Sequence, residues 1–188
     1  MVPRPVAWIS TVDEAGCVNV APFSSYNYVA TSPPMLTINI ATRPESGQVK
    51  DTARNIQLTK EFVVNVATLD NMDLMHQSAR EFPHGVSEAE VLGIPLLKSR
   101  HVTAPRIACS PVQMECRLDQ VVSLGRGINT LFIGEVIAFH LLDAVYDGHR
   151  VDVAAMRPVA RLGGPFYAGL GELIHRPMLQ KPPGAEGW

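Results

Sequence analysis

The chain has 188 residues, of which 46% are hydrophobic and 18% are charged, and its formal net charge at pH 7 is −2. Such a chain is long enough for one well-packed domain, and its composition is that of an ordinary globular protein. The scattered lysines and arginines form no basic stripe for nucleic acid, and no apolar run reaches the roughly 20 residues that a membrane-spanning helix needs.

The amino-terminal part is predicted to be β-structure. Residues 6–11 are a compact apolar run, residues 13–16 carry turn chemistry, and residues 17–21 resume the strand. Residues 35–41 alternate between apolar and polar side chains, as a half-buried strand does. The intervening residues 24–34 are polar and rich in proline, so we expect an ordered loop there rather than a central strand.

Helical patterns follow in the middle of the chain. Apolar side chains recur at i, i+4 and i+7 within residues 48–59, which predicts a short helix, and the valine-rich residues 62–67 predict another strand. Asp70 can cap a second helix. A capping box that begins at Ser87, followed by Gly93, predicts a third and very short helix.

Strands return in the later part. Residues 112–119 alternate as a half-exposed strand, with Gln113 and Glu115 on the polar side, and residues 131–142 predict a long apolar strand with a bulge or bend at Gly134. Asp147-Gly148 is a hairpin turn signal. Strands outnumber helices without alternating strictly with them, which favours a mainly β fold, an antiparallel barrel with a few short peripheral helices.

The domain organisation is predicted to be simple. We find no internal repeat and no interdomain linker, so residues 1–176 are predicted to form one domain. Residues 177–188 hold three prolines and two glycines, and we expect an irregular tail.

Several common functional motifs are missing from the sequence. There is no GxGxxG dinucleotide fingerprint, no P-loop and no GxSxG nucleophile elbow, and the six histidines have no metal-binding spacing, so we expect no metal. Cys17, Cys109 and Cys116 form no CxxC pair and no even disulfide framework. With no signal-peptide pattern, they predict reduced thiols in a cytoplasmic protein.

The segment RPESGQVKDT, residues 43–52, suits a phosphate group. It brings Arg43, Lys50 and Thr52 close to the start of a predicted helix, and Asp51 can cap that helix or orient Lys50. Two cations, a hydroxyl and the free N–H groups of a helix start are what a dianionic phosphomonoester needs. A solvated loop with incidental charges is the alternative.

The segment APFSSYNYVATSPP, residues 21–34, suits a polar aromatic ligand. It holds Ser24, Tyr26, Asn27 and Thr31 between two strands. Clustered hydroxyls, an amide and aromatic rings fit an aromatic heterocycle with several hydrogen-bonding edges. A well hydrogen-bonded barrel loop without a ligand remains the alternative.

Taken in chain order, these segments and their neighbours resemble the flavin-reductase-like family with an FMN-binding split barrel, of the nitrilotriacetate monooxygenase reductase and flavoredoxin type. The resemblance extends from residue 4 to about residue 172. The matching blocks are RPVAWIST (4–11), NVAPFS (19–24), SPP (32–34), KDT and NI (50–52, 55–56), EFVVN (61–65), SPV and EC (110–112, 115–116), IGEV (133–136) and RLGG (161–164) with Tyr167.

The resemblance implies a split β-barrel that forms a homodimer, with FMN near the subunit interface. By matching position, Ser24, Tyr26 and Asn27 would lie against the flavin ring and ribityl chain. Around the phosphate would be Thr31, Arg43, Lys50, Asp51 and Thr52, and Tyr167 would approach the site late in the chain. The implied activity is reduction of flavin by NAD(P)H, which supplies electrons to free flavin or to a partner oxygenase.

Two departures from the family pattern leave other functions open. Ala30 stands where many relatives have serine, which removes one hydroxyl contact to the cofactor. Asn129 stands where nicotinamide-using relatives often have a histidine, so a neutral amide replaces a group that titrates near neutrality. The alternatives are therefore an FMN-binding electron-transfer protein without nicotinamide activity, and a degenerate barrel that acts through protein contacts alone.

Overall fold

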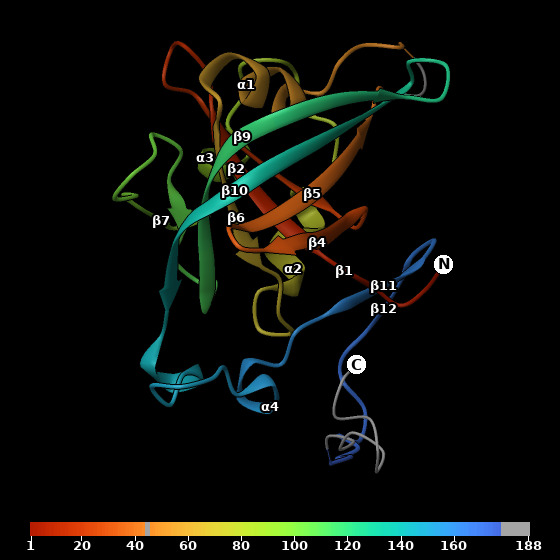
Figure 1. The fold of residues 1–188 in the computed structure, drawn as a ribbon. Coiled ribbons are helices and arrows are strands. Elements are labelled where there is room, and N and C mark those ends of the chain that lie inside the picture. Colours follow the sequence, from red (N-terminus) through yellow and green to blue (C-terminus); the bar gives the residue numbers. More distant parts are fainter. Residues whose placement is uncertain (44–45, 178–188) are drawn as a thin grey trace.

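The protein, described at residues 1–43 and 46–177 in a computed structural model, is built mainly of antiparallel β-sheet (Figure 1). Every neighbouring pair in the main sheet is antiparallel, and its edges are β3 and β4. In spatial order the strands are β3 (Val18–Phe23), β2 (Ala7–Val12), β6 (Glu61–Val66), β9 (Val112–Leu124), β10 (Asn129–Leu141), β5 (Pro34–Ala41) and β4 (Tyr26–Thr31).

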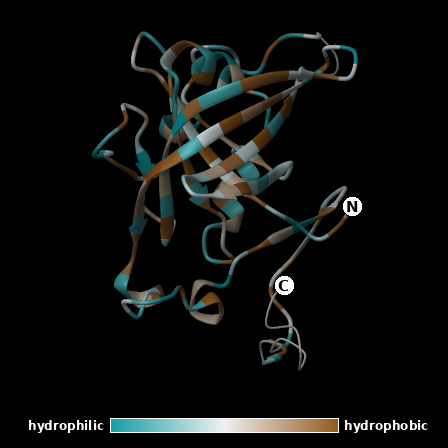
Figure 2. Ribbon diagram, viewed as in Figure 1, coloured by the Kyte–Doolittle hydropathy of each residue, from teal (hydrophilic) through white to brown (hydrophobic). Residues whose placement is uncertain are grey.

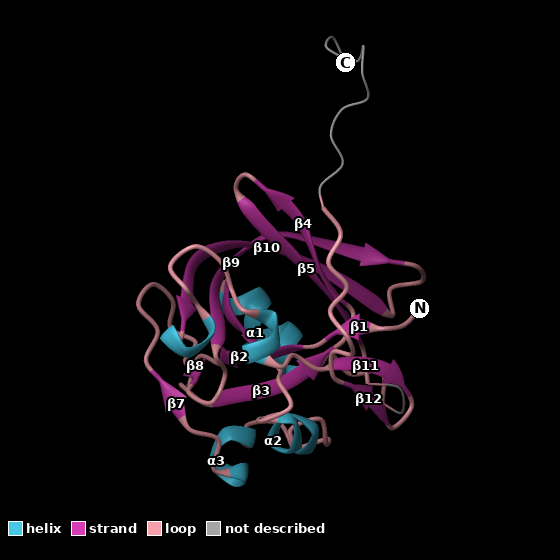
Figure 3. Cartoon of the chain, turned by 90° about the horizontal axis from the view of Figure 1, so that it is seen from below, coloured by secondary structure: helices cyan, strands magenta, loops and turns pink. Residues whose placement is uncertain are grey.

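The main sheet curls into a split barrel, with the helix α1 (Asp51–Thr59) packed among its strands (Figure 3). Inward-facing residues alternate with outward-facing ones along the strands, which gives the banded hydropathy in Figure 2. Ile9, Ile38 and Phe132 from the strands meet Ile56 from α1, and all four side chains are fully buried. Burial of this apolar surface positions α1, and therefore the residues at its start.

Smaller elements surround the barrel. The three-stranded sheet β1–β11–β12 lies to one side of it, near the amino terminus, and α2 and α3 lie outside it (Figures 1 and 3). These elements are β1 (Arg4–Pro5), β11 (Ala160–Gly163), β12 (Phe166–Ala168), β7 (Leu96–Leu97), β8 (Arg106–Ile107), α2 (Met72–Gln77), α3 (Glu88–Leu92), the 3-10 helix η1 (Asp143–Val145) and α4 (Val153–Met156).

The mainly β fold and the antiparallel barrel are confirmed, and so are the strands expected within residues 6–21, 35–41, 62–67 and 131–142. The pairing of β9 with β10 shifts register between Ile133 and Gly134, where the bulge was expected. The Ser87 hydroxyl accepts the Glu90 N–H and caps α3, which ends at Gly93 with a φ of 64°.

The prediction of a loop at residues 24–34 is wrong, because Tyr26–Thr31 forms the edge strand β4. An edge strand pairs on one side only, so it tolerates polar residues and exposes much of its surface. Tyr28, for instance, is 70% exposed. The segment is polar because it lies at the edge of the sheet.

The half-exposed pattern predicted for residues 112–119 is wrong in its first half. Gln113 and Glu115 are buried, although they lie on the face predicted to be exposed. Their side chains are covered by the segment 98–107, whose backbone they bond: the Gln113 amide donates to the Ile107 carbonyl, and Glu115 accepts the Arg100 and His101 N–H groups.

Two helix starts and one hairpin also differ from prediction. The helix expected from residue 48 begins at Asp51, because Lys50 has an extended backbone, and the second helix is preceded by Asn71 rather than by Asp70. Asp70 instead accepts a hydrogen bond from Arg157 at 2.7 Å. The turn at residues 147–148 forms, but only one bridge, Tyr146 to Val151, flanks it.

Among the residues that the structure describes, no helix combines the length and the apolar character needed to cross a membrane. The predicted irregular tail, residues 177–188, falls outside the described residues except for Pro177, which belongs to neither a helix nor a strand.

Candidate functional site

Three neighbouring pockets share lining residues, and we call them together the groove. The α1 pocket, about 250 Å³, is lined by the start of α1, by β3 and by residues 78–82. The Tyr167 pocket, about 220 Å³, shares Pro22 and Ala79 with the α1 pocket, and it shares Arg4 and Ser24 with the β4 pocket, about 470 Å³.

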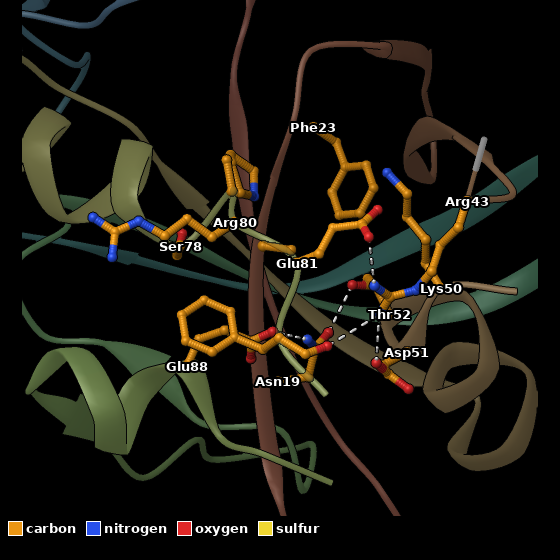
Figure 4. Close-up of a pocket in the computed structure, with 14 residues that line it drawn as sticks. Asn19, Phe23, Arg43, Lys50, Asp51, Thr52, Ser78, Arg80, Glu81 and Glu88 are labelled. Atoms are coloured by element: carbon orange, nitrogen blue, oxygen red, sulfur yellow. Dashed lines mark hydrogen bonds and ion pairs between the residues drawn. The ribbon is translucent and has the colours of Figure 1, made fainter. Parts of the chain in front are cut away.

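The α1 pocket brings two predicted cations together, Arg43 and Lys50 (Figure 4). The Lys50 ammonium lies 5.8 Å from the centre of the Phe23 ring and has no carboxylate partner among the described residues. Lys50 is also the residue before α1, and its side chain does not cap the helix. The first N–H groups of α1 have no preceding helical turn to accept their hydrogen bonds. They are therefore available to bind an anion.

Asp51 plays a different part from the one predicted. It is the first residue of α1 and contacts three groups: the Arg43 guanidinium at 3.2 Å, the Arg54 guanidinium at 2.9 Å and His84 Nδ1 at 2.6 Å. It neither caps the helix nor contacts Lys50. Arg43 also lies 3.5 Å from Glu81, so these carboxylates hold the guanidinium at the pocket wall and offset part of its charge.

The hydroxyl of Thr52 is already engaged. Thr52 is buried, and its hydroxyl donates to Asn19 Oδ1 at 2.7 Å, while the Asn19 amide donates to the Glu88 carboxylate at 2.8 Å (Figure 4). Burial raises the pKa of Glu88, although the bonds from Asn19 and the Val20 N–H oppose that shift. The group that Thr52 leaves available to an anion is its backbone N–H, not the predicted hydroxyl.

Asn19 and Glu88 are pocket residues that sequence reasoning missed as site residues. Asn19 lies in a block that matches the family, but nothing in its local sequence indicates a partner 69 residues away on α3. The capping box at Ser87 predicts only the helix that carries Glu88. Together the two side chains fix the distance between β3, α1 and α3 around the α1 pocket.

The remaining predicted residues are distributed along the groove, with one exception. Ser24 and Tyr167 line the Tyr167 pocket, and Ser24, Tyr26 and Asn27 line the β4 pocket. Burial raises the pKa of the Tyr26 hydroxyl to about 12, so this group is a neutral hydrogen-bond donor at physiological pH.

Thr31 is not brought to the α1 pocket. It pairs with Pro34 at the start of β5, whereas Arg43 follows the end of β5 at Ala41. Eight residues of strand separate the two by about 23 Å at roughly 3.3 Å per residue. Within a single protomer the structure therefore does not bring Thr31 and Arg43 together, and a shared role at the phosphate stays a prediction.

The α1 pocket fits the phosphate end of a flavin nucleotide. It offers an ammonium without a carboxylate partner, a guanidinium fork and the N–H groups of a helix start, which together suit a dianion. The β4 pocket offers Tyr26, Asn27 and Ser24 as polar and aromatic contacts for a ring system. Among residues 1–43 and 46–177, no cluster of three or more His, Cys, Asp or Glu side chains could hold a metal ion.

Comparison with known proteins gives consistent matches. The family of flavin reductase like domains matches residues 1–154. An uncharacterized protein of Halalkalibacterium halodurans is 35% identical over 96% of this chain and 89% of its own length. The crystal structure of nitrilotriacetate monooxygenase component B from Bacillus cereus superimposes with a TM-score of 0.89 at 31% identity, over 94% of this chain and 88% of that chain. The crystal structure of Pseudomonas fluorescens 2-nitrobenzoate 2-nitroreductase superimposes with a TM-score of 0.86 at 29% identity, over 98% of this chain and 89% of that chain.

Proposed function

The chain belongs to the family of flavin reductase like domains, and from that premise we propose that it is an FMN-binding oxidoreductase that uses NAD(P)H. The observation that carries the proposal is the α1 pocket, where Lys50, Arg43 and the start of α1 converge. FMN held there by Arg43, Lys50 and the first N–H groups of α1 would supply two-electron redox chemistry, with NAD(P)H as the hydride donor and free flavin or a partner oxygenase as the electron acceptor.

In this proposal the residues of the chain bind and orient rather than act as acids or bases. Lys50 and Arg43 offset the two charges of the phosphate, and the N–H groups of Asp51 and Thr52 donate to it. Ser24, Tyr26 and Asn27 would then contact the ribityl chain and the ring, which places the ring in the β4 pocket. Positioning of this kind is what hydride transfer needs, because donor and acceptor atoms must approach closely.

The family relatives support the proposal and extend it to partners. The Bacillus cereus relative is a component of a monooxygenase, so a partner oxygenase is the proposed electron acceptor of this chain also. A homodimer is proposed as well. The exposed edge strand β4, with Tyr28 70% and Val29 52% exposed, could pair with a second copy next to the β4 pocket.

Anaerobic stopped-flow mixing of the FMN-loaded protein with NADH and, separately, with NADPH tests the reductase activity. We expect the flavin absorption band to bleach with at least one of the two donors. A control with dithionite shows that the bound flavin is reducible. Bleaching by dithionite and by neither nicotinamide would contradict the reductase proposal while leaving FMN binding intact.

A second candidate is an FMN-binding electron-transfer protein without nicotinamide activity, and Asn129 favours it. Asn129 is the first residue of β10, opposite Ala41, and its side-chain oxygen accepts a hydrogen bond from Asn39 at 3.3 Å. It lines none of the three pockets and provides no titrating group at this end of the barrel. Reduction of the bound FMN by a protein donor, without reduction by NAD(P)H, would establish this function.

A further inference from the structure

Three side chains form a row across the small sheet, on the wall of the Tyr167 pocket. Arg4 of β1 lies directly opposite Arg161 of β11, and Arg161 lies directly opposite Tyr167 of β12. Side chains directly opposite one another in antiparallel strands project from the same face, with Cβ atoms about 4.5–5.5 Å apart. All three residues line the same pocket of about 220 Å³, so two arginines and a tyrosine contribute to one small cavity.

The positive charge of this row is not offset by the residues that the structure describes. No described carboxylate forms a salt bridge with Arg4 or Arg161, and no acidic residue lines the Tyr167 pocket. The Arg4 Nε is buried and has no hydrogen-bond partner among the described residues. Like charges directly opposite each other repel, and a buried donor without a partner is costly. An oxyanion between the two guanidinium groups would relieve both costs.

The row is also held in place before any ligand arrives. The Arg161 guanidinium lies 4.5 Å from the centre of the Tyr167 ring, a distance that suits a cation–π interaction. The Tyr167 hydroxyl in turn lies 3.1 Å from His76 Nδ1 on α2. Gly163 and Gly164 form the turn beside the row, with φ of 99° and 51°, and no atom lies within 4 Å of the Cβ that either could carry. The turn therefore leaves the pocket open.

We propose that Arg4, Arg161 and Tyr167 form an oxyanion subsite, which binds a carboxylate or phosphate group of the second substrate. Guanidinium groups present N–H donors in a fork that matches both kinds of oxyanion. The Tyr167 pocket joins the α1 pocket to the β4 pocket, so the flavin of the proposed function would pass the subsite, and the oxyanion would bind beside the flavin. That the ligand is a second substrate rests on the proposed function. The oxyanion is then the diphosphate of a nicotinamide donor or the carboxylate of an acidic acceptor.

Calorimetric titration of the flavin-free protein with pyrophosphate and with benzoate tests the subsite itself. We expect at least one probe to bind the wild type and Arg161→Gln to weaken that binding about tenfold or more, the scale of a charge-assisted hydrogen bond. Arg161→Lys keeps the charge without the fork and should lose part of the affinity. Arg100→Gln, which removes an exposed arginine outside the groove, is the matched control and should bind as the wild type does.

Two further variants locate the binding. Lys50→Ala removes a cation of the α1 pocket, so binding that survives in Lys50→Ala and is lost in Arg161→Gln belongs to the subsite. A preference for pyrophosphate would identify the oxyanion as that of the donor, and a preference for benzoate would identify it as that of an acidic acceptor.

Any of three results would overturn the subsite. Neither probe binds the wild type; Arg161→Gln and Arg100→Gln bind the probe equally well; or Arg161→Gln raises the dissociation constant of FMN tenfold. The last result would assign the row to the flavin instead. Failure of the proposed function is a separate result, namely that the wild type binds no FMN, and the probe titrations remain informative in that case.

Discussion

The guanidinium of Arg43 and the carboxylate of Asp51 form an ion pair at 3.2 Å beside the start of α1, with both side chains largely buried. This pair holds Arg43 at the wall of the α1 pocket and offsets part of its charge. Lys50, one residue before Asp51, has no such partner among the described residues. The charge of Lys50 is therefore less compensated than that of Arg43.

Replacing Lys50 with alanine should weaken FMN binding by about 1–3 kcal/mol, because a charge-assisted contact to the phosphate is lost. Riboflavin, which has no phosphate, should bind the variant as it binds the wild type. Quenching of flavin fluorescence measures both affinities. Lys98→Ala, an exposed lysine outside the groove, is the matched control, and equal losses for FMN and riboflavin would place the phosphate elsewhere.

The Thr52 hydroxyl is expected to matter for stability more than for the ligand. Thr52→Val keeps the shape and the backbone N–H but removes the bond to Asn19, which should lower the free energy of unfolding by about 1–3 kcal/mol. Urea denaturation checks the change, and Thr52→Ser should restore most of it. A loss of FMN affinity as large as that of Lys50→Ala, with unchanged stability, would show that the hydroxyl binds the phosphate.

Gly134 is predicted to be required by its neighbour in the barrel core. A Cβ at this position would lie 2.5 Å from Phe62 Cζ, and Phe62 is fully buried. Gly134→Ala should therefore destabilise the protein by about 1–3 kcal/mol, measured as a lower urea midpoint. The double variant with Phe62→Leu should lose less stability than the sum of the two single variants, because the smaller side chain makes room. Destabilisation that is strictly additive in the double variant would mean that the two residues do not compete for space.

Glu115 is predicted to make stability depend on pH. Burial alone would raise its pKa, but hydrogen bonds from the Arg100 and His101 N–H groups and from His140, 2.6 Å away, outweigh burial and lower the pKa below the ordinary 4.5. A lowered pKa contributes stability that is complete above the ordinary value and is lost as the pH falls through the folded-state value.

Glu115→Gln should therefore cost about 1–3 kcal/mol of unfolding free energy at pH 7 and progressively less below about pH 4. Urea denaturation at several pH values measures the difference. Glu14→Gln, an exposed carboxylate, should show no such cost. A deficit in Glu115→Gln that stays constant down to pH 3 would mean that packing of the side chain, rather than its charge, stabilises the fold.

The local sequence pattern predicted the strands and helices whose formation depends on residues close in the sequence. The alternation of residues 35–41 identifies β5, and the sequence around Ser87 and Gly93 identifies α3, because periodicity and capping are local properties. The β4 strand was missed because a polar edge strand and a loop have similar compositions.

Features that depend on distant segments could not be predicted in the same way. Burial of Gln113 and Glu115 depends on residues 98–107, which cover the outer face of β9. In the candidate site, Arg43, Lys50 and the helix start were predicted from one short segment. The hydrogen bond from the Thr52 hydroxyl to Asn19 was not predicted, because β3 and α1 are brought together only by the fold.

We propose that the α1 pocket holds the phosphate of FMN, and the decisive test is titration of the wild type and Arg43→Ala with FMN and with riboflavin. We expect the wild type to bind FMN at least about tenfold more tightly than riboflavin, and we expect Arg43→Ala to lower this preference. Equal affinity of the wild type for the two flavins, or no binding of either, would contradict it.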